Sequence, residues 1–121
     1  MTGRPKVCHY TEVPLQEVGA EAPGVGVRWV IDEEHDGAPN YALRLFEIAP
    51  GGHTPDHAHP WEQENFILEG RGRVMLDGVW HDLEPGDVVF VPADCRHTYE
   101  NTGDAPFKFL CGIPVNSRLP T

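Results

Sequence analysis

Basic side chains are scarce in this sequence. Among its 121 residues there are 9 lysines and arginines against 19 aspartates and glutamates, which gives a formal net charge of −10. Nucleic acids and anionic membrane surfaces are bound through clustered Lys and Arg, so this composition argues against both kinds of partner. Long apolar runs are missing too, and residues 1–16 lack the apolar core of a signal peptide, so we expect neither a membrane span nor a signal peptide.

Cysteine and serine are also rare. The three cysteines, Cys8, Cys95 and Cys111, are odd in number and form no CxxC pair, which argues against a disulfide framework and agrees with a reducing cytoplasm. The single serine lies in no GxSxG motif, and the sequence has no glycine-rich phosphate loop. We therefore expect a cytoplasmic protein whose chemistry uses neither a serine nucleophile nor a phosphate-binding loop.

No segment shows a helical period over three or more turns, and short strand-like runs take its place. Asp77-Gly78 joins two of these runs as a two-residue hairpin, since both central positions of a type I′ turn need a positive φ. Residues 12–21 fit either a short helical turn or an edge strand. Many short strands separated by turns predict a single all-β domain of the sandwich or jelly-roll kind. The predicted strands are 25–31, 41–48, 63–68, 73–76, 79–82, 88–91, 97–101 and 107–111.

Three of the histidines stand at metal-ligand spacing. His57 and His59 are two residues apart, so on an extended segment both project to one face, and Gln63 follows four residues after His59. A third histidine, His97, comes after the apolar strand 88–91. Because imidazole is the commonest neutral ligand for first-row metals, the pattern predicts one divalent metal inside a β-structure. The alternative is that His57 and His59 are solvated loop residues.

Two longer patterns contain these residues: Gly51-x5-His57-x-His59-x3-Gln63-x6-Gly70 and Gly86-x5-Pro92-x-Asp94-x2-His97-x3-Asn101. They resemble the first and second motifs of the cupin superfamily, and the surrounding segments resemble small single-domain bacterial cupins. The resemblance implies a cupin double-stranded β-helix, or jelly-roll barrel, over residues 39–115. It also implies an N-terminal segment, 1–38, with an edge strand that can be exchanged in a dimer, and a C-terminal tail, 116–121.

In cupins, two histidines and a glutamate of the first motif and a histidine of the second motif bind the metal. The resemblance therefore implies His57, His59, Gln63 and His97 as ligands of one divalent transition metal, with manganese or iron ahead of zinc, nickel, copper and cobalt. Gln63 is a departure, because the family usually has glutamate there. A neutral amide leaves the full +2 charge on the ion, which should acidify bound water, attract anions, favour the reduced metal and weaken metal retention. The alternative for Gln63 is a hydrogen-bonded core residue that never touches the metal.

Alternation along the strands indicates which side chains surround the metal. If Gln63 faces inward, so does Asn65, while Phe66 and Leu68 face the other way. If His97 faces inward, Tyr99 and Asn101 do so as well. Outward Phe66 and Leu68 would suit burial against a partner, and with the dimers common among small cupins this leads us to expect a homodimer.

The cupin resemblance also implies a pocket lined by Arg44, Tyr99, Phe109 and Cys111, and we take Arg44, Tyr99 and Cys111 as candidates for a catalytic role. The simpler alternatives are an outward Arg44 paired with a carboxylate, Tyr99 as core packing, and Cys111 as a small buried hydrophobe. A pocket with an aromatic wall, one cation and a divalent metal suits a small anionic, enolic or phenolic molecule.

Three functions are compatible with such a site. We favour a metal-dependent dioxygenase, an oxidoreductase in which three nitrogen ligands leave positions open for substrate and oxygen. The first alternative is a redox-inert isomerase, lyase or cyclase that uses the metal as a Lewis acid. The second is a non-catalytic module that binds a small molecule. The choice rests partly on analogy, because one fold hosts many chemistries.

Overall fold

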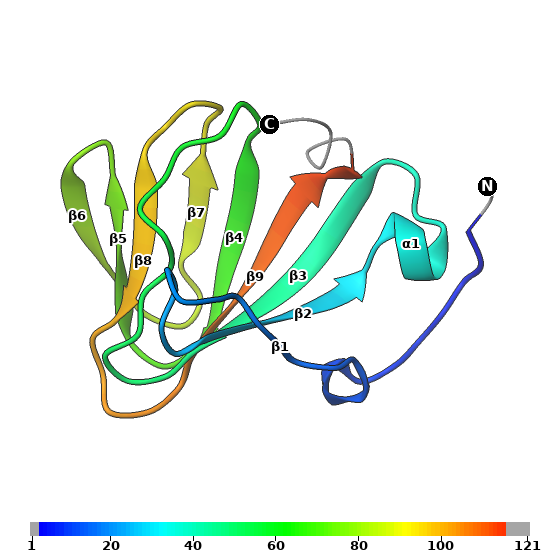
Figure 1. Ribbon diagram of the computed structural model, residues 1–121, viewed down its shortest axis with the longest axis horizontal. Helices are drawn as coiled ribbons and strands as arrows, with labels where there is room; N and C mark the ends of the chain where they lie inside the picture. The colour runs from blue at the N-terminus through cyan, green and yellow to red at the C-terminus, as the bar shows by residue number, and fades with distance from the viewer. Residues whose placement is uncertain (1–2, 116–121) are drawn as a thin grey trace.

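Two antiparallel sheets face each other and make up nearly all of the structure (Figure 1). The computed structural model describes residues 3–115. Its strands are β1 (Gln16–Glu17), β2 (Val25–Ile31), β3 (Tyr41–Ile48), β4 (Gln63–Glu69), β5 (Gly72–Leu76), β6 (Val79–Leu83), β7 (Val88–Val91), β8 (His97–Asn101) and β9 (Phe107–Pro114). The larger sheet has the order β1-β2-β3-β9-β4-β7 and the smaller sheet the order β6-β5-β8. The prediction of an all-β jelly-roll barrel is confirmed.

All eight predicted strands are present, and β2, β3, β7 and β8 have the predicted bounds. β9 continues to Pro114, beyond the predicted end at 111, because β3 offers a partner to every one of its residues up to the pair Tyr41↔Pro114. The predicted hairpin joins β5 to β6, and Asp77 and Gly78 have φ values of 48° and 89°. Both values are positive, as a type I′ turn requires.

Within residues 12–21 the edge strand is the alternative that forms, as β1, and a helical turn ends at the first residue of this range. Tyr10–Glu12 forms a short 3₁₀ helix, η1, and β1 pairs antiparallel with β2 of the same chain. The exchange of this strand in a homodimer stays a prediction, and the predicted tail 116–121 lies outside the described residues. Between residues 3 and 115 no helix is long and apolar enough to cross a membrane.

A four-residue helix, α1 (Glu33–Asp36), lies in the turn-rich segment between β2 and β3. Its N-terminus is capped by the buried carboxylate of Asp32, whose Oδ1 accepts a hydrogen bond of 2.8 Å from the backbone N–H of His35. Gly37 ends it in the left-handed conformation, with φ of 70°. One helical turn therefore lies in the connection between β2 and β3.

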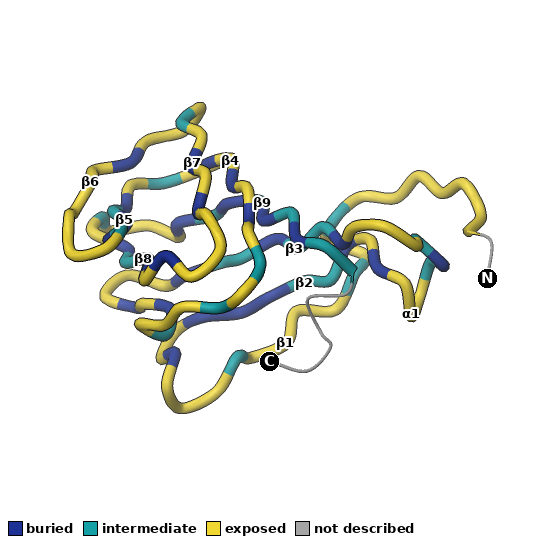
Figure 2. Tube along the Cα trace, turned by 90° about the horizontal axis from the view of Figure 1, so that it is seen from above, coloured by how far each residue is buried: buried dark blue, intermediate teal, exposed yellow. Residues whose placement is uncertain are grey.

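Alternation along β4 separates the interior from the outer surface (Figure 2). Gln63 and Asn65 are buried, whereas Phe66 and Leu68 on the opposite face are 43% and 41% exposed. The predicted alternation along β8 holds as well, since its first, third and fifth residues are all buried. The outward face of β4 is open in the single chain, and its use in a homodimer stays a prediction.

Aromatic rings join the two sheets across the interior. The ring of Phe109 on β9 stacks on Tyr99 of the smaller sheet at 4.5 Å between centres and on Phe46 of β3 at 5.2 Å. Phe107 is two residues earlier on β9, and its ring centre lies 5.5 Å from that of Phe109. Phe107 and Phe109 have no exposed surface, and each fully buried aromatic side chain stabilises the fold by about 1.5–3 kcal/mol relative to exposure.

The loop between β3 and β4 is fastened to β8 by a short ladder of hydrogen bonds. The backbone N–H of Thr54 donates to the carbonyl oxygen of Tyr99 at 2.9 Å, and the side-chain Oγ1 of Thr54 accepts from the backbone N–H of Tyr99 at 2.8 Å. Further along, His57 and His97 exchange two backbone hydrogen bonds of 3.1 and 2.8 Å. The loop therefore continues the pairing of the smaller sheet, which gives its side chains defined directions.

Replacing Thr54 by valine should destabilise the fold. Thr54→Val keeps the shape of the side chain but leaves the buried N–H of Tyr99 without its acceptor, which costs about 1–3 kcal/mol of unfolding free energy. Chemical denaturation measures this loss. Thr102→Val, at an exposed position, is the matched control and should stay within about 0.5 kcal/mol of the wild type. Equal stability of the two variants would contradict the role of the Thr54 hydroxyl.

Candidate metal centre

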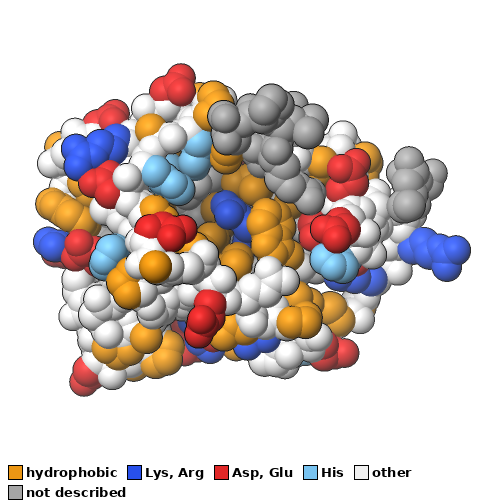
Figure 3. Space-filling model, in the orientation of Figure 1, with side chains coloured by type: hydrophobic (Ala, Val, Ile, Leu, Met, Phe, Trp, Pro, Cys, Tyr) orange, Lys and Arg blue, Asp and Glu red, His pale blue; other side chains and the backbone are white. Residues whose placement is uncertain are grey.

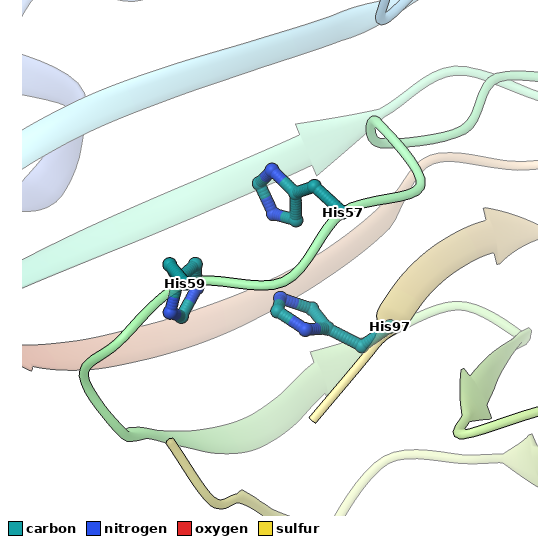
Figure 4. Close-up of side chains that lie close together, drawn as sticks. All are labelled: His57, His59 and His97. Atoms are coloured by element: carbon teal, nitrogen blue, oxygen red, sulfur yellow. The ribbon is translucent and has the colours of Figure 1, made fainter. Parts of the chain in front are cut away.

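Three of the seven histidines come together, and they are the three that the motifs singled out. His57 and His59 lie in the loop between β3 and β4, and His97 begins β8. Their ring centres are 4.8 to 5.3 Å apart, and their possible ligand atoms all lie within 4.8 Å of one another. Figure 4 shows the three rings gathered around a common space. The remaining histidines are exposed: His9, His35, His53 and His81.

Backbone carbonyls fix the orientation of two of these rings. Nδ1 of His59 lies 2.8 Å from the carbonyl oxygen of Trp61, and Nδ1 of His97 lies 2.9 Å from that of Cys95. A carbonyl oxygen only accepts, so each Nδ1 carries the hydrogen and each Nε2 keeps a free lone pair. His59 also stacks on the indole of Trp61, with ring centres 4.3 Å apart. This is the support that metal-binding histidines commonly have.

The local environment keeps the imidazoles of His57 and His97 neutral. Loss of hydration and then the positive charge that His97 and His59 would carry lower the pKa of His57 to about 4. Burial likewise lowers the pKa of His97, although its hydrogen bond to the carbonyl of Cys95 opposes the shift. A lowered pKa means that both rings are unprotonated near pH 7, the form that binds a metal.

Gln63 adds an oxygen to the three imidazoles. Its side chain is 5% exposed, and its Oε1 lies 3.2 Å from Nε2 of His59. Because Nδ1 of His59 holds the hydrogen, both of these atoms are acceptors and do not satisfy each other. Two lone pairs that face one space suit a shared cation. The residues therefore fit a divalent ion with three imidazole nitrogens and one amide oxygen, and direct binding of the ion by Gln63 stays a prediction.

The histidines open onto a pocket of about 360 Å³. Figure 3 shows a hollow in this face of the molecule, with a basic side chain at its floor and hydrophobic side chains around it. Among the described residues that line the pocket, Arg44 is the single Lys or Arg and Glu17 is the single carboxylate. The aromatic lining residues are Trp29, Phe46, Trp61, Tyr99 and Phe109.

Arg44 faces this pocket from β3. Its Nη2 donates to Sγ of Cys111 at 3.0 Å, and its guanidinium carbon lies 4.8 Å from the ring centre of Phe46 and 5.3 Å from that of Trp29. Its buried Nε has no hydrogen-bond partner in the described part of the chain, and no ion pair with a carboxylate is recorded for it there. The alternative of an outward Arg44 paired with a carboxylate is therefore wrong.

Tyr99 lines the pocket but is almost completely buried, whereas Cys111 lies behind the pocket surface. Tyr99 is 2% exposed, its hydroxyl donates to Oδ1 of Asn65, and burial raises the pKa of its phenol. Cys111 has no exposed surface, and its sulfur accepts from Arg44. Phe109, in contrast, contributes a wall of the pocket. Of the side chains proposed for catalysis, Arg44 is thus the one that combines a charge with access to the pocket.

Some residues that line the pocket were not predicted from the sequence. Trp29 shares the inward face of β2 with Val25 and Val27. Arg28 lies on the opposite face, so alternation along this strand could have identified Trp29, but the predicted set of pocket residues did not include it. Gln16 and Glu17 reach the pocket because β1 pairs with β2, and a strand of two residues has no readable period.

Comparison with known proteins agrees with this geometry. The Cupin_2 model, which describes a cupin domain, matches residues 44–113. Polyketide synthase CurC of Streptomyces cyaneus is 30% identical over 109 residues, which cover 88% of this chain and 68% of CurC. A glucose-6-phosphate isomerase of Thermococcus onnurineus is 31% identical over 119 residues, which cover 88% of this chain and 63% of the isomerase.

Among solved structures, the polyketide cyclase RemF from Streptomyces resistomycificus superposes with a TM-score of 0.85 and 31% identity, over 93% of this chain and 80% of RemF. The chain spans about half to two thirds of the length of the first curated relatives that it matches. The family match covers more than half of the sequence and contains all three converging histidines. This chain belongs to the Cupin_2 family of cupin domains.

Proposed function

We propose that this cupin is a metal-dependent, redox-inert enzyme, a cyclase or isomerase, that acts on a small enolic, phenolic or otherwise anionic molecule. The observation that carries the proposal is Arg44, a cation that faces the histidine pocket and has no recorded carboxylate partner in residues 3–115. A cation kept in an apolar pocket without a counter-charge is costly, and an anionic ligand would offset that cost.

The charges of the pocket favour an anion. The chain as a whole carries a net charge of −10, yet Glu17 is the one carboxylate among the described lining residues. The proposed ligands, His57, His59, His97 and Gln63, are all neutral and would leave the charge of a divalent ion uncompensated. We keep manganese or iron as the favoured ions, with zinc, nickel, copper or cobalt as alternatives. When bound, such an ion would supply Lewis acidity toward a substrate oxygen.

Other residues of the pocket would bind the substrate, exclude water from it and position Arg44. Arg44 holds a second anionic oxygen of the substrate through charge-assisted hydrogen bonds. The rings of Trp29, Phe46 and Phe109 hold a planar body and exclude water from it. Cys111 keeps the guanidinium in place from behind, so we assign it a positioning role instead of a catalytic one. Small changes in electron distribution along an enolate would then be stabilised at both ends of the molecule.

The dioxygenase favoured on the sequence is the second candidate. Three imidazole ligands with open positions support it. The neutral oxygen of Gln63 opposes it, because a shell without a negative ligand disfavours the more oxidised metal. The names of two relatives, a polyketide cyclase and a glucose-6-phosphate isomerase, also support the redox-inert class. For these reasons we place the cyclase or isomerase first.

Purified protein should contain close to one equivalent of a divalent transition metal. Elemental mass spectrometry on protein prepared without chelator or nickel resin measures it. Loss of two imidazoles in the His57→Ala, His59→Ala double variant should lower the content at least about tenfold, since each ligand contributes strongly to affinity. His53→Ala, which removes an exposed histidine nearby, is the control and should retain the metal. Equal metal content in all three proteins would refute the site.

Binding of a planar anion should depend on Arg44. With 2-hydroxybenzoate as the probe, Arg44→Gln should weaken binding to the zinc-loaded protein by about tenfold or more, the effect of losing a charged hydrogen bond of about 1.5–3 kcal/mol. Isothermal titration calorimetry gives the constants. Arg28→Gln is the matched control, because Arg28 pairs with Glu47 and does not line the pocket. An equal effect of both substitutions would mean that overall charge, not the pocket, sets the affinity.

Oxygen uptake separates the two candidate enzymes. We expect iron-loaded protein mixed with acetylacetone, an enolisable diketone, to consume no more oxygen than the His97→Ala variant under the same conditions. An oxygen electrode follows the reaction. Uptake that is stoichiometric with the diketone and absent from the variant would establish the dioxygenase and displace the redox-inert proposal.

A further inference from the structure

We propose that Asn65 is a positioning residue that determines which end of the Gln63 amide faces the three histidines. The inference rests on the proposed metal-binding function, because it concerns how this chain presents an oxygen ligand. Gln63 and Asn65 are adjacent inward positions of β4, 5% and 4% exposed. An amide has a donor end and an acceptor end of nearly the same shape, so only its hydrogen-bond partners decide which end faces the site.

The order of donors and acceptors begins at a backbone carbonyl. Nδ2 of Asn65 donates to the carbonyl oxygen of Leu110 on β9 at 3.1 Å. A carbonyl oxygen cannot donate, so the Asn65 amide must turn its nitrogen to β9 and its oxygen toward Gln63. Nε2 of Gln63 then donates to that oxygen at 3.2 Å. The remaining end of Gln63 is Oε1, which lies 3.2 Å from Nε2 of His59.

Tyr99 strengthens this order from the opposite sheet. Its hydroxyl donates to the same Oδ1 of Asn65 that accepts from Gln63. Reversing the Asn65 amide would set its NH₂ group against the Gln63 donor and its oxygen against the carbonyl of Leu110. Both contacts would be unfavourable inside the barrel, so the orientation is held by several buried groups at once.

This arrangement is matched to glutamine and not to glutamate at position 63. A carboxylate has no donor, so one of its oxygens would lie against the Oδ1 of Asn65 as a second acceptor. The neutral ligand at this position and Asn65 therefore belong together. In a chain with this pair, the oxygen that completes the metal shell is selected by the Leu110 carbonyl, two side chains away.

The test measures zinc affinity by competition with a chromophoric chelator. Asn65→Leu removes the acceptor for Gln63, so its amide can turn its NH₂ end to the histidines, and affinity should fall about 10- to 100-fold. Asn101→Leu is the matched control: Asn101 is 5% exposed, bonds the carbonyls of Ile48 and Ala105, and does not line the pocket. It should lower the melting temperature of the metal-free protein without changing zinc affinity.

Two further variants test the role of Asn65 if Asn65→Leu folds poorly. Asn65→Asp retains an acceptor toward Gln63 and, when protonated, a donor toward Leu110, so it should bind zinc at least as tightly as the wild type. In the Gln63→Glu background, Asn65→Leu should leave affinity unchanged or raise it, because a carboxylate has no orientation to hold and loses an opposing acceptor.

The outcomes separate the inference from the function on which it rests. Zinc binding by the wild type that is equally tight in Asn65→Leu would overturn the role of Asn65 alone. The same would follow if Asn65→Leu lost affinity equally in the Gln63→Glu background, since that result indicates general damage to the barrel. Absence of zinc binding by the wild type would overturn the metal site and the inference together.

Discussion

The pair of backbone hydrogen bonds between His57 and His97 is the contact on which the site depends. It fastens the loop after β3 to the first residue of β8, 40 residues later in the chain, and so sets the three imidazoles 4.8 to 5.3 Å apart. Thr54 continues this pairing into the interior, where the stacked rings of Tyr99 and Phe109 hold the sheets together. The arrangement of donors is thus a consequence of sheet packing and not of the loop alone.

Behind the imidazoles, the hydrogen-bond partners of each buried amide determine which of its ends faces the histidines. Asn65 accepts from Gln63 and from Tyr99 and donates to β9, so the glutamine is left with its oxygen toward the site. Arg44 is supported by a thiol and two aromatic rings, none of which neutralises it. A strongly acidic chain therefore encloses a pocket in which the balance of charge favours an anion.

The sequence contained the strands and the ligands but not the relations between them. Alternating residues on β4 were readable because one face is buried and the other is exposed, and the same alternation from His97 along β8 identified Tyr99 as inward. The hydrogen bond between the side chains of Asn65 and Tyr99 joins different sheets, so no pattern within one strand of the sequence predicts it. The short β1 carries pocket residues without a usable period, whereas the alternation of Val27, Arg28 and Trp29 along β2 could have identified Trp29 as inward.

The most direct test of the metal centre is X-ray absorption spectroscopy at the metal edge of protein loaded with one equivalent of zinc. We expect scattering from three imidazole rings together with oxygen ligands and no sulfur. Two or fewer imidazoles, or a sulfur ligand supplied by a cysteine such as Cys95 or Cys111, would contradict the convergence of His57, His59 and His97 on one ion.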